Sequence, residues 1–353
     1  MRRPLILILL VLLGFAACKN DFDQNAPYKD ITVAYGLLNP NEETHYIKVY
    51  KAFLTNDNAI TAAGELDNIS YYDNITVEVE EYVNGHRTKV MPYTMTFDVP
   101  KESGIFAYNP QVIYQNSEKL NTAATYKLKI TNKSTGKVIT AEAPLVGDFS
   151  VVAPVYDIAF FLVSKSNTAL KFRSAENAVA YDIYLKFRYI EINKNTGDTI
   201  NPNGLISWRV ARTRNTGNAP TIEVKCALNN FFNVIASNLK ADPNIIRYAK
   251  GLPESASDTS YKYKCLDLEI WAAGEDLMTY MDVNAPSNNS IVQDRANYTN
   301  MKTDDGTAYG IFSSRNITRK RLKLQNAGDS KIEDELVSGS ITGHLGFQKQ
   351  PTE

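Results

Sequence analysis

Residues 75–80 have the sequence Ile75-Thr76-Val77-Glu78-Val79-Glu80, and residues 126–131 have Tyr126-Lys127-Leu128-Lys129-Ile130-Thr131. In both stretches apolar and polar side chains alternate with period two, which is typical of a half-buried β-strand. Asn84-Gly85 and Thr135-Gly136 follow these stretches and favour tight hairpin turns, because such residues accept positive φ angles. The chain is therefore predicted to be mainly β and to consist largely of antiparallel strands.

The pattern divides the chain into two parts. Residues 28–146 predict an N-terminal immunoglobulin-like antiparallel β-sandwich. The segment Ala143-Pro144-Leu145-Val146-Gly147-Asp148 interrupts the strands, so we expect a domain boundary there. Residues 147–353 predict a larger β-rich domain with short helical insertions. Two domains also suit the length, since 353 − 17 = 336 residues remain after a leader of 17 residues.

The second part begins with another alternating stretch, in which Tyr181, Ile183 and Leu185 share one face. Phe231, Ile235 and Leu239 are then spaced by four residues, which predicts a short helix that ends before Asp242-Pro243. Further helices are predicted at residues 245–250, 275–281 and 330–337. A long surface loop is predicted at residues 284–306, where polar residues prevail.

The first residues of the chain predict a lipoprotein signal peptide at residues 1–17. Two arginines precede an apolar stretch of signal-peptide length, and Ala16 and Ala17 precede Cys18. This pattern predicts cleavage before Cys18 and lipidation of that cysteine. A membrane-spanning anchor would need about 20 apolar residues, whereas charge returns at Lys19.

Residues 18–27 are predicted to form a lipidated tether. Lys19, Asp21 and Asp23 directly follow the cysteine and resemble the export signal of Bacteroidetes surface lipoproteins. This resemblance implies a lipid anchor in the outer membrane with the protein facing the cell exterior. An ordinary polar tether is the alternative interpretation.

Two cysteines remain for other purposes. Cys226 and Cys265 lie in strand-like stretches at residues 221–227 and 261–270, and thiols outside the cytoplasm can pair. Neighbouring strands would bring the two sulfur atoms within bonding distance. A disulfide between them and a pair of unbonded, buried cysteines both remain open.

Motifs that would indicate an enzyme are absent from the sequence. The three histidines are isolated, and there is neither a Gly-x-Ser-x-Gly motif nor a glycine-rich phosphate loop. We therefore expect a protein without catalytic residues, metal or cofactor, although the two carboxylates of a glycosidase leave no short motif. Removal of Arg2 and Arg3 leaves 38 − 2 = 36 basic against 39 acidic side chains, so nucleic-acid binding is not expected. The basic stretch at residues 315–321 is interpreted as a solvated strand or helix face.

Tyrosine is abundant, with 21 residues, and provides rigid amphipathic surface for sugar rings or for a protein partner. Candidate stacking residues lie in or near the expected loops: Tyr71, Tyr72, Tyr298 and Tyr309. The alternative is that each is an ordinary strand residue. Trp208 and Trp271 lie in strand-like stretches and are predicted to belong to the core.

Several short segments together resemble an uncharacterised family of Bacteroidetes outer-membrane lipoproteins that are found beside TonB-dependent receptors. These segments are Gly36-Leu37-Leu38-Asn39-Pro40, His45-Tyr46-Ile47-Lys48-Val49, Ala52-Phe53-Leu54, Gly104-Ile105-Phe106, Tyr298-Thr299-Asn300 and Gly310-Ile311-Phe312-Ser313-Ser314-Arg315. The resemblance implies a setting at the outer membrane and a TonB-dependent receptor as partner. It implies no catalytic residues.

These observations favour a non-enzymatic surface lipoprotein that binds a ligand or a receptor, as an accessory to a TonB-dependent uptake system. One alternative is a lipoprotein that captures a glycan, with peptides as another ligand class. A second alternative is a fimbrial subunit, which is also derived from a lipoprotein and built from β-sandwiches. Maturation of fimbrial subunits typically cuts after an arginine ahead of the first strand, and none occurs between Arg3 and Arg87.

Overall fold

The computed structural model describes residues 29–55, 58–108, 110–164, 166–215, 219–253, 263–284, 298–329 and 331–349. The described part is mainly β with a few short helices, as the alternation predicts. Its strands form one 13-stranded mixed sheet and one three-stranded sheet. None of the helices in these ranges is both long enough and apolar enough to span a bilayer.

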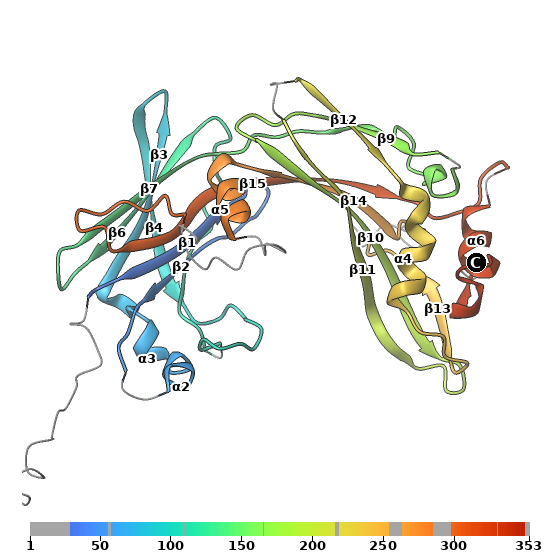
Figure 1. The fold of residues 1–353 in the computed structure, drawn as a ribbon, viewed down its shortest axis with the longest axis horizontal. Coiled ribbons are helices and arrows are strands. Elements are labelled where there is room, and N and C mark those ends of the chain that lie inside the picture. Colours follow the sequence, from blue (N-terminus) through green and yellow to red (C-terminus); the bar gives the residue numbers. More distant parts are fainter. Residues whose placement is uncertain are drawn as a thin grey trace, which may run out of the picture.

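The N-terminal half is shown at the left of Figure 1. Its strands are β1 (Thr32–Leu38), β2 (His45–Lys51), β3 (Ile75–Val83), β4 (His86–Thr96), β5 (Ile113–Asn116), β6 (Thr125–Asn132) and β7 (Val138–Pro144). Their order in the sheet is β1-β2-β5-β4-β3-β6-β7, and every neighbouring pair is antiparallel. Short helices follow β2, namely α2 (Ala59–Ala63), α3 (Leu66–Ile69) and the 3₁₀ turn η1 (Tyr72–Asn74).

The first core lies within this half. β4 pairs with β3 along residues 86–93 and with β5 along residues 94–96, so one long strand joins the two ends of the sheet. Ile47 and Val49 of β2 are buried in the same cluster as Leu128 and Ile130 of β6. The apolar sides of the alternating strands therefore pack against each other, as in the predicted sandwich. The predicted Asn84-Gly85 turn is confirmed, with φ angles of 50° and 77°.

The C-terminal half is shown at the right of Figure 1. Its strands are β8 (Val151–Ala153), β9 (Thr168–Arg173), β10 (Ala180–Asn193), β11 (Thr199–Arg214), β12 (Thr221–Cys226), β13 (Ile245–Ala249), β14 (Leu266–Ala273), β15 (Ala308–Leu322) and β16 (Phe347–Gln348). Strands β12, β9 and β8 form the small sheet. Helices are α4 (Phe231–Asn238), α5 (Glu275–Asn284) and α6 (Ile332–Ser338), with 3₁₀ turns η2 (Phe160–Val163), η3 (Leu228–Asn230) and η5 (Gly343–Leu345).

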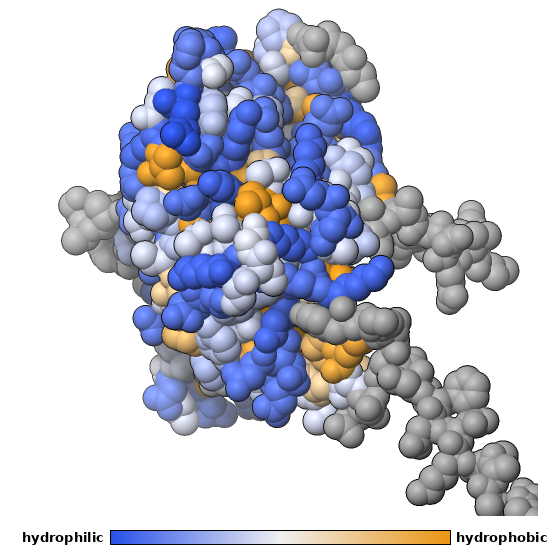
Figure 2. Space-filling model, turned by 90° about the vertical axis from the view of Figure 1, so that its left-hand side faces the viewer, coloured by the Kyte–Doolittle hydropathy of each residue, from blue (hydrophilic) through white to orange (hydrophobic). Residues whose placement is uncertain are grey.

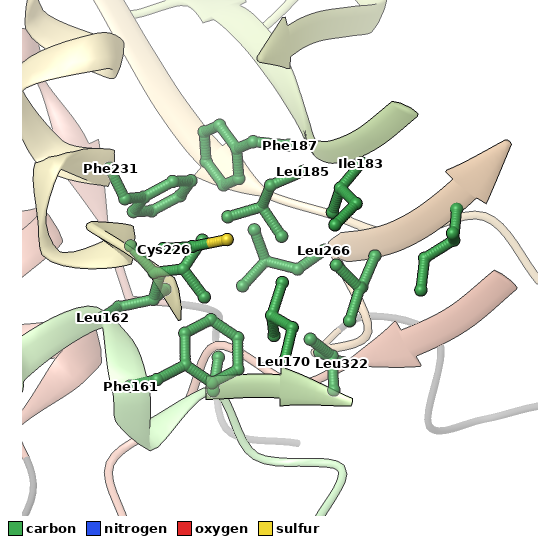
Figure 3. Close-up of a cluster of buried hydrophobic side chains, with 14 of the residues drawn as sticks. Phe161, Leu162, Leu170, Ile183, Leu185, Phe187, Cys226, Phe231, Leu266 and Leu322 are labelled. Carbon is green, nitrogen blue, oxygen red and sulfur yellow. The ribbon is translucent and has the colours of Figure 1, made fainter. Parts of the chain in front are cut away.

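The second core lies between the large sheet, the small sheet and the helices. Figure 3 shows Ile183, Leu185 and Phe187 of β10 pointing toward Leu170 of β9 and Phe231 of α4. All five side chains are almost completely buried. Because α4 and α6 cover this side of the sheet, the opposite side of β10, β14 and β11 faces the N-terminal half in Figure 1.

Strand β15 joins the two halves. Its first part pairs in parallel with β1, from Thr32↔Ala308 to Leu38↔Ser314. Its second part pairs antiparallel with β14, from Ala273↔Arg315 to Leu266↔Leu322. Phe312 is fully buried in the first core and Leu322 in the second. The first core thus includes residues far beyond the boundary that we predict after Val146.

Three of the four predicted helices are confirmed as α4, α5 and α6. The prediction of a helix at residues 245–250 is wrong, because this segment forms strand β13. β13 pairs antiparallel with β10 and in parallel with β16, at Arg247↔Phe347. Both partners are distant in sequence, so local spacing gives no signal of the pairing. Most of the loop predicted at residues 284–306 lies outside the described residues.

His45 at the start of β2 is buried and should make stability depend on pH. Burial lowers the pKa of its imidazole, and the carboxylate of Glu42 offsets this only in part. The unfolded chain therefore binds the proton first, and stability is lost as the pH falls below about 6.5. Urea unfolding from pH 8 to pH 5 should show this loss, with a slope of at most about 1.4 kcal/mol per pH unit. A His45→Gln variant should lose the slope, whereas His86→Gln, at the exposed start of β4, should retain it.

Candidate functional site

The candidate site lies where helix α5 crosses the face of the large sheet at the junction of the two halves. The backbone N–H of Leu277 donates a hydrogen bond to Ser313 Oγ on β15, at 3.1 Å. The rings of Tyr280 on α5 and Tyr35 on β1 meet edge to face, with centroids 6.3 Å apart. Met278 of α5 is buried. These contacts hold α5 against both β1 and β15.

A pocket of about 240 Å³ opens beside α5, and we call it the junction pocket. Its wall comes from β1, β10, β11, β14, β15 and α5. The apolar lining consists mainly of Leu37, Tyr184, Trp271, Leu277, Met278 and Met281. The charged groups in the lining are Asp182, Arg212 and Arg315. The pocket is thus an apolar recess with a few charged groups, formed jointly by both halves.

Trp271 forms the central aromatic surface of this pocket. Its ring lies 5.2 Å from the ring of Tyr184, and Arg315 approaches its face at 5.4 Å. Lys186 Nζ lies 5.2 Å from the same ring, and the indole N–H donates to Glu269 Oε2 at 2.9 Å. Cation–π contacts and this hydrogen bond fix the orientation of the indole. The ring is therefore held in place before any ligand arrives.

The prediction that Trp271 belongs to the core is wrong. Leu268 and Ile270 on β14 point into the second core, whereas Glu269 and Trp271 alternate with them onto the opposite face. The sequence carries a signal for this placement. Trp271 lies two and four positions after Glu269 and Asp267, and residues at this spacing share one face of a strand. Trp208 on β11 is partly buried against the second core, in agreement with its prediction.

Ion pairs hold the charged side chains of the pocket in fixed positions. Arg212 donates to Asp182 through two nitrogens, both at 2.6 Å, in the bidentate geometry that favours rigid pairing. Arg315 donates to Glu42 Oε1 at 3.0 Å, which connects β15 to the loop after β1. The arginines are thus held at the pocket with their guanidinium planes oriented.

A second, more polar pocket of about 470 Å³ lies near the start of α5. Its acidic lining residues are Glu176, Glu275 and Asp276. Within the described ranges, no three His, Cys, Asp or Glu side chains are grouped closely enough to hold a metal ion. Tyr298 donates its hydroxyl hydrogen to Asp276 at the edge of this region.

The four candidate stacking tyrosines do not form one platform. Tyr71 is 7% exposed, and its hydroxyl donates to Asp30 Oδ1 at 2.5 Å, so its prediction as a stacking residue is wrong. The hydroxyl of Tyr72 donates to Asp67, and its ring lies 6.5 Å from that of Phe97. Tyr309 is exposed on β15, beside Val33 of β1. Of the four, Tyr309 retains the exposure that stacking requires.

The two cysteines are unbonded and buried, so the second of the two interpretations left open by the sequence holds. Cys226 ends β12 in the small sheet, whereas Cys265 precedes β14 in the large sheet. The strands are therefore not neighbours, although both thiols are buried in the second core. Figure 3 shows Cys226 among Leu162, Phe231 and Leu266.

Both thiols should be unreactive in the folded protein. Burial raises the pKa of Cys226 to about 11 and that of Cys265 to about 12, and the thiolate is the reactive form. We expect no alkylation by iodoacetamide at pH 8 under native conditions. In guanidinium without a reductant, both cysteines should be alkylated, as counted by mass spectrometry. Two cysteines that stay protected after unfolding would contradict this assignment.

Cys18, Lys19, Asp21 and Asp23 lie outside the described residues, so lipidation and export remain predictions from the sequence. Figure 2 shows the face of the N-terminal half that is turned away from the junction. In this view hydrophilic residues predominate, and hydrophobic residues form small separate groups.

Comparison with known proteins gives little similarity. Neither a protein-family model nor a curated protein matches the sequence. Among solved structures, the C-terminal globular domain of the oligosaccharyltransferase from Pyrococcus abyssi matches with 11% sequence identity and a TM-score of 0.22. The match covers 68% of this chain and 53% of that chain, so this protein spans about half of that structure.

Proposed function

We propose that this protein is a non-enzymatic, lipid-anchored outer-membrane protein that binds its ligand in the junction pocket. The pocket is the observation that carries the proposal. Binding sites are typically concave and mostly apolar, with a few fixed polar groups, and the junction pocket has this composition. Its volume suits a single ring or a side chain rather than a large molecule.

The sequence supports the location and the partner. Cys18 would carry the lipid, and Lys19, Asp21 and Asp23 would direct the protein to the cell exterior. The resemblance to lipoproteins found beside TonB-dependent receptors supports a role as an accessory to uptake. The protein would then hold a nutrient or a receptor loop at the cell surface.

A glycan is the ligand class that the aromatic side chains of the pocket favour. Trp271 and Tyr184 present ring surface beside Asp182 and Arg212, which can hydrogen-bond to hydroxyl groups. A peptide side chain would use the apolar wall but would leave these paired polar groups without a role. We therefore place a saccharide ring first among the candidate ligands.

Affinity purification tests the uptake role. The tagged lipoprotein would be recovered from its native outer membrane in mild detergent, and co-purifying proteins would be identified by mass spectrometry. We expect enrichment of one TonB-dependent receptor. A Cys18→Ala variant, which cannot be lipidated, is the control and should be absent from the outer-membrane fraction.

Three results would contradict the proposal. Turnover of a saccharide or a peptide by the purified protein would indicate an enzyme. Recovery of the protein in surface polymers, with its N-terminus removed, would favour the fimbrial alternative. Recovery of the bait alone would remove the accessory role in uptake.

A further inference from the structure

The face of the large sheet that extends from the junction pocket carries a marked excess of positive charge. Strands β11, β10, β14 and β15 lie side by side, and residues in register share a face. On the face opposite the second core, the basic residues are Lys186, Arg188, Arg209, Arg212, Arg214, Arg315, Arg319 and Arg321. The acidic residues on this face are Asp182, Asp267 and Glu269. We call these eleven residues the basic strip.

The excess is local to this face. Eight basic against three acidic side chains give a formal charge of 8 − 3 = +5, whereas the whole chain has a net charge of −1. Arg315 also pairs with Glu42 of the N-terminal half and Arg214 with Asp282 of α5, which still leaves 5 − 2 = +3. The positive charge on the strip is therefore not a consequence of the overall composition.

The two central carboxylates each pair with two cations. Asp267 lies 3.2 Å from both Arg188 and Arg321. Glu269 lies 2.7 Å from Lys186 and 2.8 Å from Arg319. Each carboxylate is 1% exposed, and one cation would neutralise it. For Glu269, the second cation, Arg319, is an excess that stability does not require.

The same ion pairs position the cations for a ligand. Arg319 remains 48% exposed, and Arg209 on β11 is also exposed. A guanidinium that is anchored on one side and open on the other can bind a carboxylate or sulfate without losing much side-chain entropy. Trp271 and Tyr184 lie at the end of the strip nearest the junction pocket.

We propose that the basic strip and the junction pocket together bind an acidic oligosaccharide, with one ring against Trp271 and its carboxylate or sulfate groups on the strip. The inference rests on the proposed function and specifies its ligand. Charge complementarity carries it, because a neutral glycan would leave the excess cations unmatched. Aromatic rings at the end of the strip favour a saccharide over an acidic peptide or a simple polyanion.

Calorimetry with matched oligosaccharides tests the inference. The mature lipoprotein in detergent would be titrated with a hexagalacturonate and its neutral methyl ester, and with a sulfated chondroitin hexasaccharide and its neutral form, which is desulfated and methyl-esterified. We expect an acidic member to bind at least about tenfold more tightly than its desulfated or esterified counterpart, since charged groups form the stronger hydrogen bonds. Its affinity should fall as the salt concentration rises.

Arginine variants provide the second measurement. Arg319→Gln should weaken acidic binding by about tenfold, while Glu269 keeps its partner Lys186. Arg87→Gln is the matched control, because Arg87 is 54% exposed and also pairs with a glutamate, at 2.7 Å. Binding by the control should equal that of the unmodified protein.

The outcomes separate this inference from the proposed function. Equal binding of charged and neutral members, lost in Trp271→Ala, would overturn the acidic ligand and leave the pocket as the binding site. Equal affinity for duplex DNA would overturn it by indicating non-specific attraction to polyanions. If neither acidic oligosaccharide bound, the inference would also be overturned. The receptor purification would still test the uptake role.

Discussion

Replacement of Gly310 by alanine should destabilise the protein by about 4 kcal/mol or more, an unusually large effect for a single methyl group. Gly310 lies on β15 opposite Ala34 of β1 and has a φ angle of 103°. A Cβ atom at this position would lie 2.0 Å from the carbonyl oxygen of Ala34. Backbone atoms cannot move away as a flexible side chain can, so the parallel pairing of β15 with β1 should be disrupted.

Urea unfolding of the mature protein in detergent would measure this effect. Gly104→Ala is the control, because no heavy atom lies within 4 Å of the position that its new methyl group would take, and its φ angle is not positive. The control should unfold at the same urea concentration as the unmodified protein. An unfolding midpoint of Gly310→Ala equal to that of Gly104→Ala would show that the pairing is dispensable.

Replacement of Glu269 by glutamine should cost about 3 kcal/mol, because it leaves two neighbouring cations without their partner. Glu269 is 1% exposed and accepts hydrogen bonds from Lys186 and Trp271. Glutamine preserves the shape but removes the negative charge. The matched control is Glu223→Gln, which breaks an exposed pair with Lys171 and should leave the unfolding midpoint close to that of the unmodified protein.

The pH dependence of Glu269 has a defined sign. Burial by itself would raise the pKa of this carboxyl, but hydrogen bonds from Lys186 and Trp271 and the charges of Lys186 and Arg319 outweigh burial and lower it. The stabilisation is therefore present above the unfolded pKa of about 4.3 and is lost as the pH falls below it. The difference in unfolding free energy between the protein and Glu269→Gln should shrink accordingly. A difference that stays constant down to pH 3 would contradict this.

Local alternation predicts the strands and not their partners. The stretches at residues 75–80 and 126–131 form β3 and β6, which are neighbours, because their apolar sides have to be buried together. The parallel pairing of β1 with β15 joins residues almost 280 positions apart, and no local pattern indicates such a contact. The helix prediction for β13 is wrong for the same reason, since its partners decide its conformation.

The candidate site is only partly predictable from the sequence. Tyrosine is expected to provide the ligand surface, yet Tyr71 is buried, and the central ring of the pocket is Trp271. The spacing of Trp271 from Asp267 and Glu269, in steps of two residues, is the signal that places it on the charged face. The pocket itself depends on α5 crossing β15 beside β1, which requires the tertiary structure.

Fluorescence of Trp271 tests the central claim most directly. The chain has two tryptophans, so a Trp208→Phe variant reports from the junction pocket alone. Titration of this variant with the acidic and neutral hexasaccharides should produce a saturable change in emission for at least one of them. The same ligand should not bind to Trp271→Ala. Calorimetric binding that leaves Trp271 emission unchanged and persists in Trp271→Ala would show that the junction pocket is not the binding site.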